Sequence, residues 1–152
     1  MRTAFVNALV YPVTAEPFDG FVTVSDGIIT GLGSGRPDGE FDRTEDLGGR
    51  ALLPGFIDAH THEGMIQGEI GGAGDDINEM SDPVTPHLRA IDGINPADPS
   101  LREALDAGIT LVNTGPGSAN VIGGQFAVIR PVGRIIDEMI VKQPSCLKIA
   151  FG

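Results

Sequence analysis

Short apolar segments separated by polar turns occupy the first third of the chain and predict β structure there. The predicted strands cover residues 4–10, 21–25 and 28–32. The last two flank Asp26-Gly27, a dipeptide that strongly favours a two-residue hairpin turn. Residues 34–49 are polar and rich in Gly and Asp, so we expect a surface loop. The pattern of residues 1–52 therefore predicts a small region of β structure.

From Phe56 onward the pattern changes to strands alternating with helical segments. The predicted strands cover residues 56–60, 109–113, 126–129 and 146–150. Residues 100–107 predict a helix, with Ser100 and Glu103 as its capping box and Gly108 just past its end. Residues 135–141 fit a helix and a strand equally well. An α/β part is therefore predicted for residues 53–152.

Residues 64–99 show little apolar periodicity and contain several turn signals of the Asp-Pro and Asn-Pro type. A structureless span of this length is unusual inside a compact domain. It is typical either of a functional lid or of a structural element that the pattern does not reveal.

The composition narrows the class of protein. The 152 residues suit one domain of ordinary size, and 22 glycines with 11 prolines argue against a helical bundle. A net charge of −11 argues against nucleic acid and anionic membranes as partners. No apolar run approaches the roughly 20 residues of a membrane span. Cys146 has no partner for an internal disulfide, which predicts a cytoplasmic protein.

The segment Pro54-Gly55-Phe56-Ile57-Asp58-Ala59-His60-Thr61-His62 carries the candidate chemistry. In a strand alternate side chains share one face, so Asp58, His60 and His62 are expected to point the same way. Two residues along a strand span about 6.6 Å. That spacing lets two imidazoles reach one metal ion at about 2.0–2.1 Å. The Pro-Gly turn before the strand and the Gly-rich stretch after it place the histidines at its C-terminal end, so His60 and His62 are predicted metal ligands.

Other polar residues leave alternatives open. Asp58 could orient an imidazole or make a structural hydrogen bond. Lys148 could be a carboxylated metal bridge, although a lysine that reaches solvent from an edge strand is favoured. Cys146 is expected to be a small buried residue and not a nucleophile. The loop at residues 115–124 could offer backbone N–H groups to a substrate carboxylate or be a plain turn, and His87 is expected to be a structural loop residue.

Several of these motifs resemble the metal-dependent amidohydrolase superfamily. The hairpin at Asp26-Gly27 resembles the small β-sandwich domain that these enzymes carry beside their barrel. Residues 54–62 resemble their first barrel strand with its His-x-His metal ligands, and residues 107–112 are similar to the start of their second strand. Residues 78–93, together with 115–124, resemble the imidazolonepropionase-related branch.

The resemblance implies both a fold and an activity. The fold is α/β, with a small β-sandwich part at residues 1–52 and the first portion of a (β/α)₈ TIM-type barrel at residues 53–152. One or two divalent metal ions, usually zinc, would activate a water that hydrolyses a carbon–nitrogen bond of a non-peptide or small peptide-like amide. The implied partner is a small-molecule amide, and a homo-oligomer is left open.

The sequence also departs from the family pattern. A barrel typically needs about 250 residues. The family supplies a bridging carboxylated Lys or Glu, two later histidines and a final Asp, whereas this sequence has three histidines in all. We therefore expect an N-terminal fragment that is inactive by itself, and the sequence assigns no catalytic residue. Two alternatives stay open, a metallophosphoesterase with a His-x-His site and a non-catalytic partial barrel that needs a partner. The β region before the motif argues against the phosphoesterase.

Overall fold

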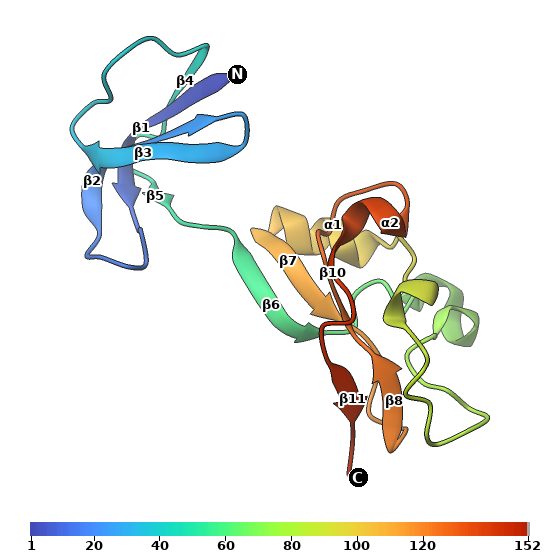
Figure 1. Cartoon of the computed structure of the whole chain (residues 1–152). Coiled ribbons are helices and arrows are strands. Elements are labelled where there is room, and N and C mark those ends of the chain that lie inside the picture. The colour runs from blue at the N-terminus through green and yellow to red at the C-terminus, as the bar shows by residue number, and fades with distance from the viewer. Residues whose placement is uncertain (152) are drawn as a thin grey trace. The chain divides into compact units, whose positions relative to one another are not determined.

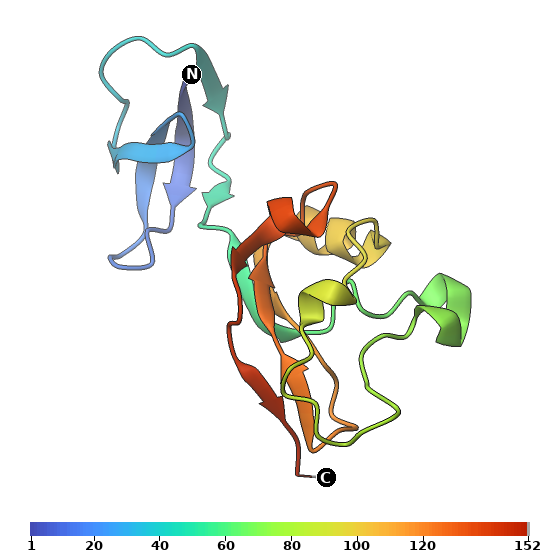
Figure 2. The same ribbon diagram turned by 45° about the vertical axis from the view of Figure 1, so that its right-hand side comes forward.

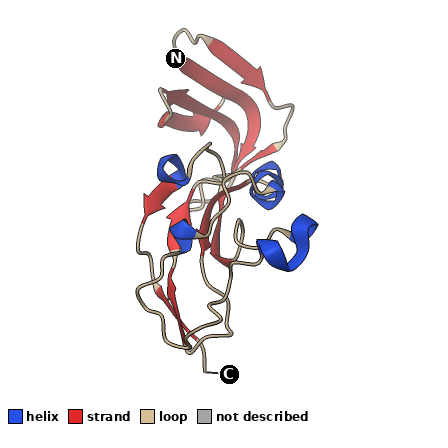
Figure 3. Cartoon of the chain, turned by 90° about the vertical axis from the view of Figure 1, so that its right-hand side faces the viewer, coloured by secondary structure: helices blue, strands red, loops and turns tan. Residues whose placement is uncertain are grey.

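The computed structural model describes residues 1–151, and for residues 68–70 it describes the backbone without the side chains. The chain divides into two compact units, Met1–Pro54 (unit 1) and Gly55–Gly152 (unit 2) (Figure 1). Strands predominate over helices in the ribbon (Figure 3), and the mixed α/β class is confirmed. Within the described residues no helix is long and apolar enough to cross a membrane.

Unit 1 forms one five-stranded sheet. Its strands are β1 (Arg2–Val10), β2 (Phe18–Ser25), β3 (Ile28–Ser34), β4 (Arg43–Asp46) and β5 (Ala51–Leu52). The order is β3-β2-β1-β4, and β5 also pairs with β1. The predicted hairpin is confirmed: Asp26 and Gly27 have φ values of 49° and 82°, the positive values that a type I′ turn requires.

The expected loop at residues 34–49 is wrong in part, because it contains β4. That strand has the sequence Arg-Thr-Glu-Asp and is mostly exposed. It therefore lacks the apolar alternation that marks a half-buried strand. Its pairing with β1 is parallel and cannot be deduced from the four residues alone.

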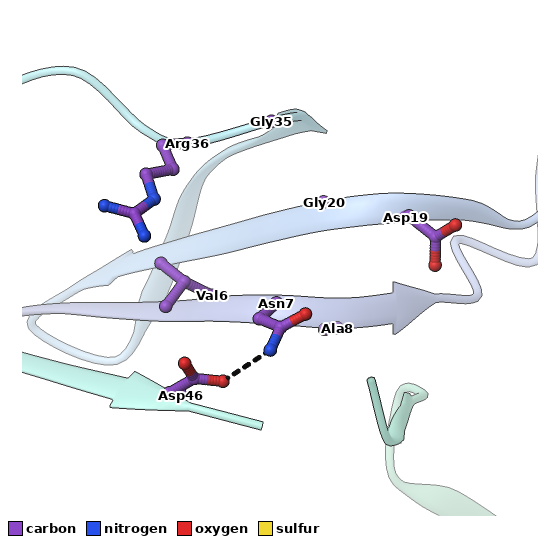
Figure 4. Close-up of a pocket in the computed structure, with 8 residues that line it drawn as sticks. All are labelled: Val6, Asn7, Ala8, Asp19, Gly20, Gly35, Arg36 and Asp46. Carbon is purple, nitrogen blue, oxygen red and sulfur yellow. Dashed lines mark hydrogen bonds between the residues drawn. The ribbon is translucent and has the colours of Figure 1, made fainter. Parts of the chain in front are cut away.

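A bulge in β1 opens a polar hollow on unit 1. Asn7 adopts φ 53°, and its amide donates to Asp46 Oδ1 at 2.8 Å. The Gly48 N–H donates to the same oxygen and, with Asn7, holds the pKa of the Asp46 carboxyl below its ordinary value. Asn7 and Asp46 line an open cavity of 380 Å³, together with Arg36 and Asp19 (Figure 4).

Unit 2 is built on a β-α-β connection. Strand β6 (Phe56–Thr61) and strand β7 (Ile109–Thr114) pair in parallel, and helix α1 (Pro99–Asp106) lies between them in sequence. These three elements confirm the predicted strands and helix. The remaining elements are β8 (Ile122–Gln125), β9 (Ala127–Ile129), α2 (Ile136–Met139), β10 (Ile140–Lys142) and β11 (Leu147–Ile149).

The strands of unit 2 form two sheets. One has the order β10-β9-β7-β6, and the other pairs β11 with β8 (Figure 2). Strand β9 runs antiparallel to both of its neighbours, so β6–β7 is the one parallel pair among the strands of residues 55–151. A TIM-type barrel therefore stays a prediction. The ambiguous residues 135–141 contain both a helix, α2, and the start of a strand, β10.

Residues 64–99 are anchored along their length. Two stretches of 3₁₀ helix lie in this segment: the first, Gly68–Gly74, is interrupted by a kink at Gly71, and the second is Ala90–Asp92. Met65, Ala90 and Ile94 enter the core of unit 2 together with buried residues of α1, β7 and β9. The segment thus contains elements that the pattern did not reveal, because short 3₁₀ helices carry no 3.6-residue periodicity.

Helix α1 begins one residue before the predicted range, and its N-cap lies two residues before the predicted one. Asp98 is its N-cap, with Oδ1 accepting a 2.9 Å hydrogen bond from the Ser100 N–H, and Pro99 is the first helical residue. The capping box with Ser100 as N-cap is therefore wrong, because Pro suits the first helical position and moves the start back. Gly108, at φ 90° after the C-cap residue, is confirmed in its predicted place.

Substitution of Asp98 by alanine is expected to lower the free energy of unfolding by about 1 kcal/mol, the typical cost of losing an N-cap. Urea denaturation followed by circular dichroism measures the loss. Ser100→Ala is the matched control, because the buried Ser100 Oγ has no hydrogen-bond partner among the described residues. Equal losses in the two variants would contradict the assignment of Asp98 as the cap.

Candidate metal centre

Strand β6 contains one extra residue just before its histidines. Asp58 pairs with Val112 of β7, and Thr61 pairs with Thr114, so three steps along β6 match two along β7. Val112 and Thr114 are both fully buried and lie on one face of β7. Residues paired across a sheet point to the same side, so Asp58 and Thr61 lie on that buried face as well.

The bulge changes which side chains share a face. His60 and His62 flank Thr61 and lie on the opposite face, so the prediction that Asp58 shares their face is wrong. Asp58 Oδ1 accepts a 3.0 Å hydrogen bond from the backbone N–H of His60. Of its two predicted roles, the structure thus supports the structural hydrogen bond.

The two imidazoles converge although the strand is irregular. Their ring centroids are 5.5 Å apart, and the rings are nearly perpendicular, at 87°. The ring of Phe126 lies beneath both, with its centroid 5.2 Å from His60 and 6.3 Å from His62. Phe126 is 1% exposed, so an apolar floor closes one side of the pair.

The hydrogen bond of His62 selects the tautomer of its neutral ring. Its Nδ1 lies 2.6 Å from the carbonyl oxygen of Gly115, which can only accept. In the neutral ring the proton is therefore on Nδ1, and Nε2 carries the lone pair. This is the arrangement that orients a metal-binding imidazole through its second nitrogen.

The role of the Gly115 carbonyl was not foreseen from the sequence, which singled out the loop at residues 115–124 for its N–H groups alone. A Cβ at this position would lie 2.3 Å from two atoms of the Phe126 ring, so only glycine allows the ring to pack here. The available signal was a glycine directly after a strand and before Pro116. That signal marks a turn and does not reveal a contact with a ring or an imidazole.

Lys148 of β11 faces the histidines. Its Nζ lies 3.4 Å from Nε2 of His60 and 5.9 Å from the centroid of the Phe126 ring. Lys148 does lie on an edge strand, as the favoured prediction had it, and its half-buried side chain contacts His60 in a solvent-accessible pair. Residues 88 positions apart in the sequence meet here.

The other candidates lie elsewhere or have different surroundings. Cys146 is exposed, so the prediction of a buried residue is wrong. His87 is exposed, within the segment before the second 3₁₀ helix. In the loop at residues 115–124 the N–H of Gly117 already donates to the Ile77 carbonyl at 2.7 Å. No group of three or more His, Cys, Asp and Glu side chains within the described residues could hold a metal ion.

The chain is similar along almost its whole length to a solved protein. An amidohydrolase from Thermotoga maritima matches it with a TM-score of 0.92 and 47% sequence identity, over 99% of this chain and 39% of the other. The chain belongs to the amidohydrolase superfamily. The family prediction is thereby confirmed. No family model matches the chain.

Curated amidohydrolase relatives agree with this placement. An amidohydrolase named tasK from Hapsidospora irregularis is 39% identical over 76% of the chain. A 5-methylthioadenosine/S-adenosylhomocysteine deaminase from Syntrophomonas wolfei is 38% identical over 53%. An imidazolonepropionase from Streptococcus pyogenes is 44% identical over 29%. The chain spans 12%, 19% and 11% of the lengths of these three relatives.

Proposed function

We propose that this chain belongs to a metal-dependent hydrolase that cleaves carbon–nitrogen bonds in small-molecule amides, with His60 and His62 as two of its metal ligands. The observation that carries the proposal is the hydrogen bond between His62 Nδ1 and the Gly115 carbonyl. In the neutral ring this bond selects the tautomer whose Nε2 carries the lone pair, and a second imidazole lies beside it. Two imidazole donors suit zinc best among the divalent cations abundant in cells.

The surroundings of the pair fit such an ion. The Phe126 ring excludes water from one side and limits the movement of both imidazoles. Lys148 is the nearest candidate for a further ligand, because its amine lies 3.4 Å from His60. A neutral lysine amine that adds CO₂ and releases one proton becomes a carbamate, whose two oxygens share one negative charge. Lys148 would then be the carboxylated metal bridge that the sequence left open.

The proposal assigns separate tasks to the residues. A divalent cation, when bound, supplies a Lewis acid that makes water more acidic and polarises a carbonyl oxygen. His60 and His62 would hold it, and the Gly115 carbonyl keeps the His62 ring in the correct orientation and tautomer. His60 lies at the C-terminal end of a parallel strand and His62 directly follows it. This is the position of active sites in (β/α)₈ barrels, so the proposal includes a barrel of this type.

Small-molecule amides are the proposed substrates, and the relatives' names support C–N hydrolysis more directly than phosphate-ester hydrolysis. The net charge of −11 favours neither nucleic acid nor anionic membrane as a partner. A cytoplasmic location is part of the proposal, because the single cysteine fits a reducing compartment. Self-association of the protein stays open and is measurable by light scattering.

Metal removal tests the proposal. The full-length protein is treated with a chelator, assayed on cyclic amides, N-acyl amino acids and aminopurine nucleosides, and then reloaded with Zn²⁺. We expect hydrolysis of at least one of these classes to fall below detection and to return with the metal. Hydrolysis that is unaffected by chelation, or activity confined to phosphate esters in a parallel panel, would contradict the proposal.

A further inference from the structure

The two strands that meet at the candidate metal centre belong to different sheets. His60 lies on β6, which pairs with β7, whereas Lys148 lies on β11, which pairs with β8. A backbone ladder between β6 and β11 is absent from the described residues. The 3.4 Å separation of the two side chains must therefore be fixed by other contacts.

The side chain of Asn113 makes those contacts. It lies on β7 between the buried residues Val112 and Thr114, and therefore points to the opposite face, that of the histidines. Its Nδ2 donates to the carbonyl of Ala59 at 3.1 Å, and its Oδ1 accepts from Ser145 Oγ at 2.6 Å. One amide thus connects the residue before His60 with a residue just before β11.

The first of these bonds is made at the bulge of β6. Ala59 lies between Asp58 and Thr61, where the backbone pairing of β6 with β7 is interrupted. A bulge leaves a residue without its ladder partner and re-aims the side chains next to it. The Asn113 amide replaces a backbone donor there, and so holds the peptide that leads into His60.

The second bond reaches both the floor of the site and β11. The Ser145 N–H donates to the Phe126 carbonyl at 2.9 Å, and Ser145 is followed by Cys146 and β11. A shift of Asn113 would therefore move β6 relative to the Phe126 ring and to the lysine strand. A displacement of about 1 Å is enough to impair a metal site. Loss of this link is therefore expected to change metal binding measurably.

We propose that Asn113 is a positioning residue of the metal centre, which aims His60 through the Ala59 carbonyl and fixes its spacing to Lys148 through Ser145. This inference rests on the proposed function, since it takes His60 and His62 as ligands. Outer partners of metal ligands typically change metal affinity by about 10-fold to 100-fold when they are removed. Removal of the Asn113 amide is expected to weaken metal affinity by a factor in this range.

The test titrates the full-length protein, freed of metal, with Co²⁺ and records its visible absorption bands. Asn113→Leu keeps the approximate volume and removes the bonds to Ala59 and Ser145, together with a longer one from Nδ2 to Cys146 Sγ at 3.7 Å. Ser145→Ala removes the bond between Ser145 and Asn113 and leaves the one to Ala59 in place. Thr110→Val is the matched control, because the Thr110 hydroxyl also joins β7 to a β6 carbonyl, that of Phe56 at 3.4 Å, but does so at the opposite end of the strand pair.

We expect N113L to weaken Co²⁺ binding by about 10-fold or more and to shift the absorption bands, with a smaller change in S145A and none in T110V. A residue that only stabilised the fold would lower the melting temperature and leave the bands in place. Unchanged affinity and bands in N113L, or in S145A should N113L fail to fold, would overturn this inference alone. A wild-type protein whose Co²⁺ binding is indifferent to His62→Ala would overturn the proposed function as well.

Discussion

Replacement of His60 or His62 by alanine in the full-length protein is expected to lower kcat/KM by about 1,000-fold or more. Metal-ion catalysis contributes several kcal/mol, and about 1.4 kcal/mol corresponds to a factor of ten. Each imidazole supplies a donor that nothing nearby replaces, because no group of three or more His, Cys, Asp and Glu side chains within the described residues could hold a metal ion. Steady-state kinetics and the metal content of the purified variants measure the two effects together.

His87→Ala is the matched control for both variants. It removes the remaining histidine of the chain, whose side chain is exposed in the segment before the second 3₁₀ helix. We expect wild-type kinetics and wild-type metal content for this variant. Loss of metal in His87→Ala, or full metal content and activity in His62→Ala, would show that the ligands have been assigned to the wrong histidines.

Lys148→Met tests whether the lysine is itself a metal ligand in addition to the two histidines. If Lys148 contributes a carbamate, this variant loses metal and activity, and bicarbonate no longer affects the metal loading of the apoprotein. If the amine merely packs on the Phe126 ring, the unbranched methionine side chain keeps that contact and the metal content is unchanged. The wild-type protein, loaded with and without bicarbonate, provides the comparison.

The local patterns of the sequence predicted the elements that carry their own signal. Asp26-Gly27 sets its own hairpin, and the apolar runs beginning at Phe56 and Ile109, with a helix between them, are sufficient to specify a parallel pair. His60 and His62 could be singled out because two residues of one strand carry the signal. Even there the alternation failed at Asp58, since one inserted residue reverses the face of everything before it.

What the sequence could not provide lies between distant segments. The acceptor of His62 is 53 residues away, and the lysine beside His60 is 88 residues away. Strand β4 has no apolar residues to mark it, and its place is fixed by β1. The position of Asp98 as the N-cap depended on Pro99, a local signal that was overlooked in favour of Ser100. Most of the site thus depends on contacts that no local periodicity records.

Substitution of Gly115 by alanine is expected to have the second large effect, on stability and on metal affinity together. The added Cβ would overlap the Phe126 ring, whose atoms lie 2.3 Å from its position, and the ring is buried and cannot move into solvent. Overpacking of this kind typically costs about 1–3 kcal/mol of unfolding free energy. Displacing the ring or the Gly115 carbonyl also releases His62 from its acceptor, so weaker Co²⁺ binding should accompany the loss.

Two further variants assign the effect to the contact with the ring. Gly72→Ala is the matched control, because a Cβ at Gly72 meets nothing within 4 Å, and its unfolding free energy should stay close to that of the wild type. Phe126→Leu, combined with Gly115→Ala, makes room for the new methyl group and should restore part of the lost stability, a non-additivity expected of residues in contact. It should restore metal affinity less, since the aromatic floor beneath both imidazoles is then gone. A Gly115→Ala protein as stable as the wild type would mean that the backbone at residue 115 can retreat from the ring, and that the His62 acceptor is not held by this contact.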